Sequence, residues 1–368
     1  MIEETCYIPV STLQSFMVDV FIALGVPPKD AATCSEVLIT SDLRGIESHG
    51  IGRLKMYFDR IMKGLQKPVT TFEVVHESPT TALVDGHHGM GQVIGVRSMQ
   101  MAIDKARVYG MGSVAVRNST HFGIDGYYPL MAVQAGMIGF SVTNARPSIA
   151  PTFSVRPMLG TNPIAFGAPT DEEFPFLFDA ATSITQRGKI EVLARKGQPV
   201  PDGWVIGRDG NFVSDPDAIL EGFAKEENAL LPLGGAGELL AGYKGYGLAT
   251  IVEILSASLQ SGQFLYGLLG VAEDGSLKPN CIGHFFMAIN IEAFVPLAEF
   301  KATTGAILRE LRAATKAPGQ ERIYTAGEKE FENEKTVRQQ GVPVLPKLQN
   351  EIRTIQAALG LTQYHFPF

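Results

Sequence analysis

Hydrophobic side chains recur at the spacing of amphipathic helices through the first 70 residues. One stripe repeats every three or four positions and ends at Gly25, a typical helix stop; its members are Leu13, Phe16, Met17, Val20, Phe21 and Leu24. The same spacing predicts a second helix from Pro28 to about Gly45 and a third from Leu54 to Leu65. We therefore expect three helices in this part of the chain.

From residue 80 onward, short β-branched runs alternate with helical segments. The pattern predicts strands at residues 81–85, 113–116, 138–143, 164–168, 174–179 and 284–294, and helices at 93–109, 127–134, 242–261 and 345–359. The stretch 189–228 is rich in Gly, Pro and charged residues, so we expect it to form turns and short hairpins.

Helices at both ends with strands between them indicate that the two termini pack together. We expect a mixed α/β fold in which residues 1–75 and 305–368 form a helical domain and residues 76–304 form an inserted mixed-sheet domain. The segment 86–91, Gly-His-His-Gly-Met-Gly, follows a predicted strand. Its glycine spacing is not that of the dinucleotide-binding fingerprint, so we interpret it as a turn.

The composition excludes several classes of function. The formal charge is −7, with 45% hydrophobic and 19% charged residues, as in ordinary globular proteins. Without a basic run, nucleic acid is not expected as a partner. No stretch is apolar enough to span a bilayer, and the first residues lack the basic and apolar regions of a signal peptide. Three widely spaced cysteines suggest neither disulfides nor zinc, so we expect a cytoplasmic protein without a metal.

The segment 41–54, Ser-Asp-Leu-Arg-Gly-Ile-Glu-Ser-His-Gly-Ile-Gly-Arg-Leu, gathers three chemically active side chains. Ser48 supplies a hydroxyl, His49 an imidazole and Arg53 a guanidinium. If a helix follows Gly50, His49 and Arg53 lie four residues apart on nearly the same face. A proton-transfer group beside a fixed cation suits a small carboxylate substrate. The alternative is that Ser48 caps the next helix while the other two are solvated.

Further candidates follow the predicted strands. His121 comes just after the strand at 113–116 and is followed by Gly123, so it belongs to a loop at a strand end, where catalytic groups are often displayed. Asp179 ends an apolar strand; it either caps the following turn or orients a histidine. Thr161 lies in Gly-Thr-Asn-Pro, which also fits a simple tight turn.

Several motifs in order give the chain a resemblance to a known family, from about residue 10 to about residue 360. They are SDLRGIESHGIGRL, NSTHFGIDGYY, GTNPIAFGAPT, FDAATS, Pro-Asp-Gly-Trp at 201–204, GYKGYGLA, GHFFMAI and Pro-Gly-Gln-Glu at 318–321. The chain resembles the malate/L-lactate dehydrogenase family of the non-Rossmann type. That family includes sulfolactate and ureidoglycolate dehydrogenases and reductases of cyclic imino acids and diketogulonate.

The resemblance implies roles for particular residues. In the imino-acid reductase branch, the counterparts of Ser48, His49 and Asp179 form a charge relay, with Arg53 and Thr161 binding substrate. In the ureidoglycolate branch, the counterpart of His121 accepts the proton, so two assignments stay open. The resemblance further implies a homodimer and NAD or NADP held largely by the sheet domain. The implied cofactor-binding residues are His121, Asn144, Asp179, Ala180, Ala181, Lys244, Pro318, Gly319 and Gln320.

Together these features predict an NAD(P)-dependent 2-hydroxy acid dehydrogenase, with malate as the expected substrate. A dicarboxylate needs a second cation, which Arg146 or Arg156 could supply. Lactate, sulfolactate, ureidoglycolate, imino acids and diketogulonate are the alternatives within the family. A rival from another class is a hydrolase that uses Ser48, His49 and Asp179. We expect adjacent Ser and His not to form the required hydrogen bond, and the Gly-x-Ser-x-Gly elbow is absent from the sequence.

Overall fold

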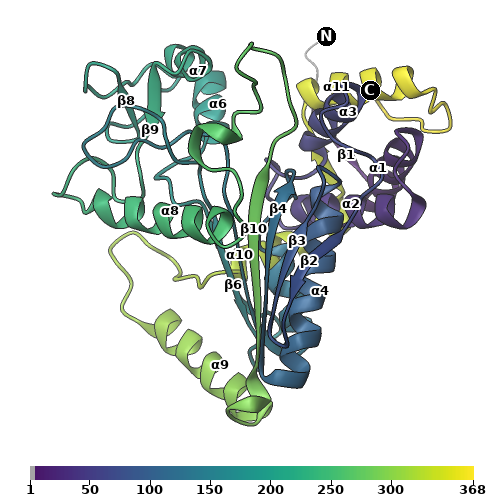
Figure 1. Ribbon diagram of the computed structural model, residues 1–368. Coiled ribbons are helices and arrows are strands. Elements are labelled where there is room, and N and C mark those ends of the chain that lie inside the picture. The colour runs from purple at the N-terminus through teal and green to yellow at the C-terminus, as the bar shows by residue number, and fades with distance from the viewer. Residues whose placement is uncertain (1–4) are drawn as a thin grey trace.

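A seven-stranded mixed sheet forms the centre of the computed structural model, which describes residues 5–368 (Figure 1). The strand order is β2-β3-β4-β10-β5-β6-β7. Their bounds are β2 Glu73–Glu77, β3 Thr81–Asp85, β4 Met111–Ser119, β10 Ile282–Asn290, β5 Met137–Thr143, β6 Ile164–Ala168 and β7 Phe176–Ala180. The pair β3–β4 is parallel and the other five pairs are antiparallel. The mixed α/β class expected from the sequence is confirmed.

Helices cover both faces of this sheet. Helix α4 (Gly91–Tyr109) and α5 (Tyr127–Gln134) pack on one face and α8 (Gly242–Ala257) lies across the other (Figure 1). The core beneath α4 and α5 contains Val114, Val116, Tyr128 and Phe286, all fully buried. Helix α4 approaches α5 closely at Gly95, where a Cβ would lie 2.5 Å from the Tyr128 ring. A side chain there would push the two helices apart.

The two ends of the chain pack together, as expected. Strand β1 (Cys6–Ile8) pairs antiparallel with β11 (Val342–Val344), and Phe16 meets the rings of Tyr364 and Phe366 edge-on. The helices of this unit are α1 Val10–Ala23, α2 Pro28–Leu43, α3 Leu54–Met62, α10 Glu328–Gln340 and α11 Pro346–Leu359. The expected boundaries fall inside β2 and α9 (Leu297–Ala313), so the division into two domains stays a prediction.

The expectation for residues 189–228 was wrong in part. Two helices, α6 (Arg187–Lys196) and α7 (Pro216–Ala224), accompany the short hairpin of β8 (Val205–Gly207) and β9 (Asn228–Leu230). Asp215 caps α7 by accepting hydrogen bonds from two backbone N–H groups. Scattered apolar residues of this region, among them Ile190 and Ile219, meet in a third core. Such long-range packing is not visible as local periodicity.

Other elements were missed or differ in length. All five residues of β2 are exposed, so β2 lacks the alternation that predicts a strand. The sequence did not delimit α9 and α10. The strand expected to reach residue 294 ends at Asn290, where a short 3₁₀ turn begins, and α8 and α3 end at Ala257 and Met62.

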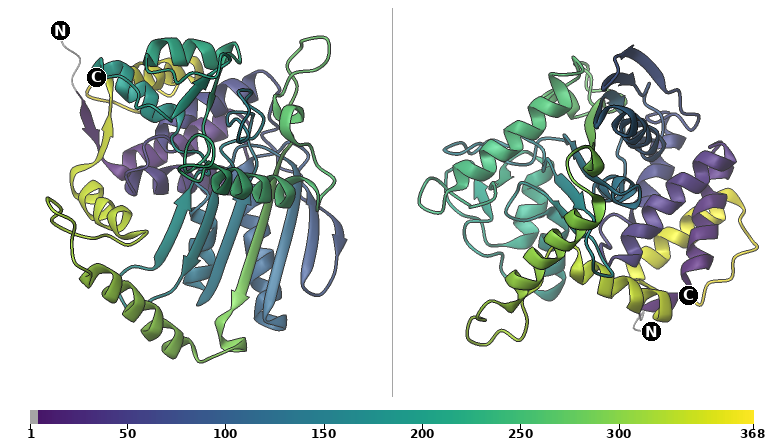
Figure 2. Two further views of the ribbon diagram at one scale, coloured as in Figure 1. Left: turned by 90° about the vertical axis from the view of Figure 1, so that its left-hand side faces the viewer. Right: turned by 90° about the horizontal axis from the view of Figure 1, so that it is seen from below.

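One end of the sheet gathers the strand ends that matter for function. Figure 2 (left) shows α9 across one end of the strands and the terminal helices beyond the other. In the strand registers, Ser119 lies opposite Ile282 and Ile164 lies opposite Ala180. Thr143 pairs with His284, two residues further along β10. The loops after β4, β5 and β7 therefore leave the sheet at the same edge, facing the terminal helices.

Candidate active site

The loop that carries Ser48 and His49 is folded against the end of α2. The backbone N–H of Ile51 donates to Asp42 Oδ2 at 2.8 Å, and Ser41 Oγ donates to the carbonyl of Ile46 at 2.7 Å. The loop packs directly on this carboxylate, since a Cβ at Gly50 would lie 1.9 Å from Asp42 Oδ1. A short 3₁₀ turn, Ile51–Arg53, then leads into α3. The buried Asp42 thus fixes the path of the segment.

Within this loop the three candidate side chains contact one another. Ser48 Oγ and His49 Nδ1 are hydrogen-bonded at 2.8 Å, and Arg53 Nε donates to the carbonyl of Ser48 at 2.6 Å. The expectation that adjacent Ser and His would not bond was wrong, because the turn brings both side chains to the same side. Among residues 5–368 no carboxylate forms an ion pair with Arg53. Its terminal N–H groups are available to an anion.

His121 lies two residues beyond the end of β4, as predicted, and reaches the helical unit. Its Nδ1 is 2.5 Å from the hydroxyl oxygen of Tyr57 in α3, and the backbone N–H of Gly123 points to the same nitrogen at 3.3 Å. The Tyr57 hydroxyl also lies 3.4 Å from the His121 carbonyl oxygen. The rings of His121 and His49 stack with centroids 5.6 Å apart. The two candidate imidazoles therefore share one site.

The two neutral tautomers of His121 satisfy different sets of these contacts. With the proton on Nδ1, the ring donates to Tyr57, whose hydroxyl then donates to the His121 carbonyl, but the Gly123 N–H loses its acceptor. With the proton on Nε2, Tyr57 and Gly123 both donate to Nδ1. Only the first tautomer leaves a lone pair on Nε2 to accept a proton.

The surroundings hold both imidazoles neutral. Burial lowers the pKa of His49 to about 4, with the positive charge of Arg53 adding to the effect. Burial also lowers the pKa of His121 well below its ordinary value, and His49, Arg53 and Arg60 act in the same direction. Desolvation and nearby cations both disfavour the charged imidazolium. Each ring can therefore act as a proton acceptor near neutral pH.

A cavity of about 390 Å³ joins these groups to the edge of the sheet. That volume is in the range of small-molecule sites. The predicted residues that line it are Ser48, His49, Arg53, His121, Asn144, Thr161, Asp179 and Ala181. Ala180 is the last residue of β7 and lies between the lining residues Asp179 and Ala181 in the sequence. The structure thus brings segments more than 100 residues apart into one site.

Asp179 lines the same cavity. It accepts a hydrogen bond from the backbone N–H of Gly126 at 2.7 Å. Burial raises its pKa to about 6, while that hydrogen bond and Arg44 oppose the shift. Within the described part of the chain, the carboxylate is not hydrogen-bonded to either imidazole. The serine–histidine–aspartate relay lacks its third contact, and the orienting role of Asp179 stays a prediction.

Asp125, which sequence reasoning overlooked, shares this wall. Its Oδ1 accepts from Ser141 Oγ at 2.5 Å, and its Oδ2 is buried without a partner in the described residues. Burial and the neighbouring Asp179 raise the pKa of Asp125. It belongs to the quoted motif NSTHFGIDGYY, four residues after His121. Asp125 thus adds a second buried carboxyl group to the lining of the cavity.

Other candidates lie outside the cavity. Lys244 is exposed near the start of α8, with Nζ 5.9 Å from the ring centre of Tyr243. Residues Pro318, Gly319 and Gln320 are exposed in the loop between α9 and α10. Their contact with cofactor stays a prediction.

Neither arginine proposed for a second carboxylate lines the cavity. Arg156 donates to the Tyr266 hydroxyl at 3.3 Å and stacks over that ring. Arg146 is exposed, and its positive charge acts on Arg60. Tyr57 was also missed by sequence reasoning, although it lies four residues after Arg53 and so shares its helix face.

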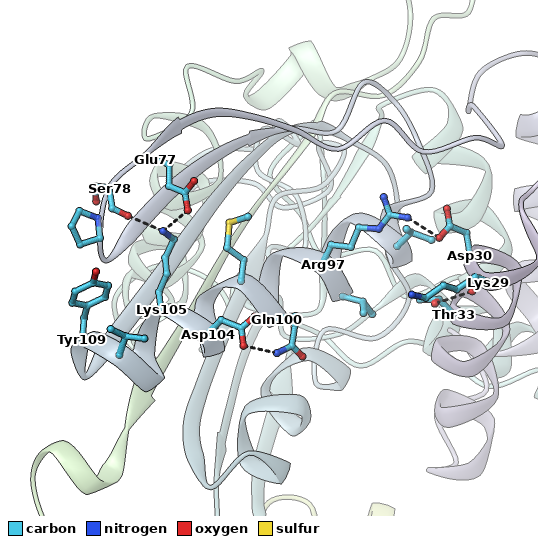
Figure 3. A pocket seen from close by; sticks show the side chains of 15 residues that line it. Lys29, Asp30, Thr33, Glu77, Ser78, Arg97, Gln100, Asp104, Lys105 and Tyr109 are labelled. Atoms are coloured by element: carbon cyan, nitrogen blue, oxygen red, sulfur yellow. Dashed lines mark hydrogen bonds and ion pairs between the residues drawn. The ribbon is translucent and has the colours of Figure 1, made fainter.

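A larger hollow of about 910 Å³ lies between α2, α4 and the hairpin of β2 and β3 (Figure 3). Its charges are paired with one another: Lys105 Nζ lies 2.8 Å from Glu77, and Arg97 lies 2.8 Å from Asp30. Histidine is absent from its described lining. Because its lining lacks histidine and four of its charged side chains are paired, this hollow is a weaker candidate for a catalytic site than the smaller cavity.

Among residues 5–368, no group of three or more described His, Cys, Asp or Glu side chains is arranged to hold a metal ion. None of the helices in that range is long and apolar enough to cross a membrane.

Two neutral imidazoles beside an unpaired guanidinium define a proton-transfer site for a small anion. Comparison with known proteins identifies the family. The sequence profile of the malate/L-lactate dehydrogenase family matches residues 8–353, and the chain belongs to this family. It is therefore an oxidoreductase of the dehydrogenase type, which implies a nicotinamide cofactor. The resemblance seen in the sequence is confirmed.

Individual relatives match over nearly their full lengths. A malate dehydrogenase of Pyrococcus horikoshii is 46% identical, with 98% of this chain and 97% of the relative covered. An L-sulfolactate dehydrogenase of Methanocaldococcus jannaschii is 38% identical, covering 95% and 96%. The crystal structure of malate dehydrogenase from Entamoeba histolytica superposes with a TM-score of 0.94 at 43% identity, covering 99% and 100%.

Proposed function

We propose that the protein interconverts malate and oxaloacetate with NAD or NADP. The observation that carries the proposal is the cavity in which the neutral imidazole of His121 lies near the unpaired guanidinium of Arg53. An anionic substrate that loses a proton needs this pair of groups. The choice of malate is supported by the 46% identity to a protein named malate dehydrogenase.

In the oxidative direction His121 accepts the hydroxyl proton on Nε2. The tautomer protonated on Nδ1 provides the required lone pair, with Tyr57 as the acceptor for Nδ1–H. Arg53 binds the C1 carboxylate, and Thr161, which also lines the cavity, hydrogen-bonds the substrate. We assign the proton to His121 rather than His49, because His121 lies in the loop at the end of β4 and therefore on the sheet that is expected to hold the nicotinamide.

The acidic wall of the cavity suits the nicotinamide group. Asn144, Asp125, Asp179 and Ala181 all line the cavity, so carboxylate and amide oxygens there would accept hydrogen bonds from the carboxamide of a nicotinamide. When bound, the oxidised cofactor accepts the hydride from C2 of the substrate. Asp125 and Asn144 would orient the ring, while Asp179 also keeps the Gly126 loop in place.

We also propose the arrangement of the whole enzyme: a helical domain, residues 1–75 and 305–368, a cofactor-binding sheet domain, residues 76–304, and a cytoplasmic homodimer. The helical unit leaves Tyr7, Ile22 and Met62 exposed, which supports burial against a second copy. Light scattering at micromolar concentration should give twice the mass of one chain. A fully active monomer would contradict the dimer.

The reaction is tested by the absorbance of reduced cofactor. Purified protein is mixed with NAD or NADP and, in turn, malate, lactate, sulfolactate and ureidoglycolate. We expect reduction with malate to be fastest, and to be lost in His121→Ala but kept in His365→Ala, which alters an exposed histidine of the tail. Faster reduction with another acid would reassign the substrate. No reduction with any of them would refute the proposed activity.

A further inference from the structure

Two arginines and three acidic residues contribute to the described lining of the active-site cavity. They are Arg53, Arg187, Asp125, Asp179 and Glu330. Burial raises the pKa of both aspartates, and neighbouring carboxylates add to the shift: Asp179 acts on Asp125, and Glu330 acts on Asp179. The three acidic groups therefore lie near one another. The positive charges of this lining are those of Arg53 and Arg187, because both imidazoles are neutral.

The acidic groups do not neutralise these two arginines. Burial lowers the pKa of Arg44, while Glu330 and Asp179 oppose the shift, so both carboxylates lie near this buried guanidinium outside the lining. Arg44 thus offsets part of the acidic charge. Within the described residues, no ion pair joins Arg53 or Arg187 to a carboxylate of the lining. Both guanidinium groups are therefore open to an anion in the cavity.

Both arginines are close to Ser48. Arg53 Nε donates to the carbonyl of Ser48 at 2.6 Å. Arg187 is the first residue of α6, and the next residue, Gly188, packs against the same serine, since a Cβ there would lie 4.0 Å from Ser48 Cβ. The hydroxyl of Ser48 is in turn hydrogen-bonded to His49. The start of α6 is therefore placed beside the guanidinium proposed to bind the C1 carboxylate and beside the stacked imidazoles.

The guanidinium of Arg187 is accessible and weakly held. Its side chain is 60% exposed, and its Nε lies 3.1 Å from Glu191, one turn further along α6. Glu191 lies outside the cavity lining, and its side chain is 44% exposed. Exposed pairs of this kind contribute little to stability, so an anion in the cavity can replace this partner. An arginine that lines the cavity and is largely exposed lies where the cavity opens to solvent.

We propose that Arg187 binds the second acidic group of a dianionic 2-hydroxy acid, the far carboxylate of malate or a sulfonate in its place. Arg53 holds the C1 carboxylate beside the imidazoles, and Arg187 holds the other end of the substrate at the mouth of the cavity. A planar guanidinium suits either acidic group, because it donates two parallel hydrogen bonds. Arg187 takes the role that the sequence suggested for Arg146 or Arg156, neither of which lines the cavity. This assignment rests on the proposed 2-hydroxy acid dehydrogenase activity.

The test compares a dianionic with a monoanionic substrate in the same variants. In Arg187→Gln, kcat/KM for malate should fall about tenfold, mainly through a higher KM, while kcat/KM for lactate should change less than about twofold. Arg187→Lys keeps the charge and should recover part of the loss. Lys189→Gln is the matched control, because it removes an exposed positive charge from the same turn of α6 outside the lining, and it should change neither value.

The variant Glu191→Gln separates substrate binding from a structural role of the ion pair. If Arg187 acted only by pairing with Glu191 and so holding α6 in place, both variants would lose activity with malate to the same extent. Under the proposal, Glu191→Gln removes the competing partner of the guanidinium, so kcat/KM for malate should be unchanged or higher. A loss in Glu191→Gln equal to that in Arg187→Gln would overturn the assignment.

Inhibition provides a readout that does not require turnover of lactate. Succinate and propionate differ by one carboxylate, and Arg187→Gln should weaken inhibition by succinate alone. Equal losses for both anions, or no loss for either, would also contradict the assignment. A wild-type enzyme that oxidises none of the hydroxy acids would instead refute the proposed activity. Sulfolactate affected like malate would support a sulfonate as the second ligand, whereas sulfolactate unaffected would overturn that part of the proposal.

Discussion

Replacing Tyr57 by Phe removes one hydroxyl from the contact with His121 and leaves the buried ring in place. Tyr57 is fully buried between Phe21 and His121, and its oxygen lies 2.5 Å from His121 Nδ1. In the proposed reaction this oxygen accepts the Nδ1–H bond while Nε2 receives the substrate proton. The substitution therefore acts on the proton acceptor without touching substrate or cofactor.

The size of the effect follows from the change in charge during proton transfer. A hydrogen bond between neutral groups contributes about 1 kcal/mol and one to a charged group about 1.5–3 kcal/mol. The contact of Tyr57 with His121 is therefore stronger by roughly 1 kcal/mol once the ring is cationic. We expect kcat to fall about five- to tenfold. The acidic limb of the kcat profile should move to lower pH by about one unit, because the imidazolium loses its acceptor.

The assay is the pH profile of kcat for malate oxidation, which reports the enzyme–substrate complex. Tyr128→Phe is the matched control: its hydroxyl donates to the Phe122 carbonyl at 2.5 Å and is equally buried, but it does not contact His121. Tyr128→Phe should lower the free energy of unfolding but leave the acidic limb of the kcat profile at the same pH. If the limb of Tyr57→Phe moved to higher pH, the hydroxyl would be a donor to Nδ1 and the proposed tautomer would be wrong.

Four further substitutions test other parts of the site. His121→Ala should lower kcat by 10²–10⁴-fold, and His49→Ala should lower it less. If initial rates show the larger loss in His49→Ala, then His49 and not His121 accepts the proton. Arg53→Lys should raise the substrate KM and leave the cofactor KM unchanged, because lysine loses the two-pronged geometry. Burial raises the pKa of Asp42 to about 8, against the hydrogen bond from Ile51, so the folded chain retains a proton that the unfolded chain releases. The free energy of unfolding therefore falls as pH rises from about 4 to 8. Over that range, the free energy of unfolding of Asp42→Asn in urea should increase by at least about 1 kcal/mol relative to that of the wild type.

Local patterns were sufficient for the parts of the site that lie within one segment. The position of His121 just after a strand, and the spacing of Ser48, His49 and Arg53, are visible in the sequence and recur in the structure. The contact between Tyr57 and His121 joins residues 64 positions apart. Tyr57 is one of several aromatic residues at helical spacing and looks like an ordinary core residue until the sheet edge is placed against α3.

Electrostatic contacts were the hardest to predict, because burial and distant partners determine them. Nothing near Asp179 in the sequence indicates that its carboxylate would bind the Gly126 backbone rather than a histidine. In the sequence, Arg60 likewise looks like a solvated helix residue, because Asn280, which accepts a hydrogen bond from it, lies 220 positions away. The family resemblance indicated residues with a shared role. The distribution of charge around the cavity could be described only from the folded chain, because it depends on burial and on partners distant in the sequence.

That distribution links the protonation of His121 to substrate binding. Arg53 and Arg60 lower the pKa of His121, so the imidazole is neutral before a substrate arrives. In the proposed reaction, the substrate carboxylate held by Arg53 offsets part of this positive charge and makes the imidazole more basic at the moment when a proton must be accepted. Arg53 would therefore favour an anionic substrate twice, once by binding it and once by making the proton acceptor more effective in its presence.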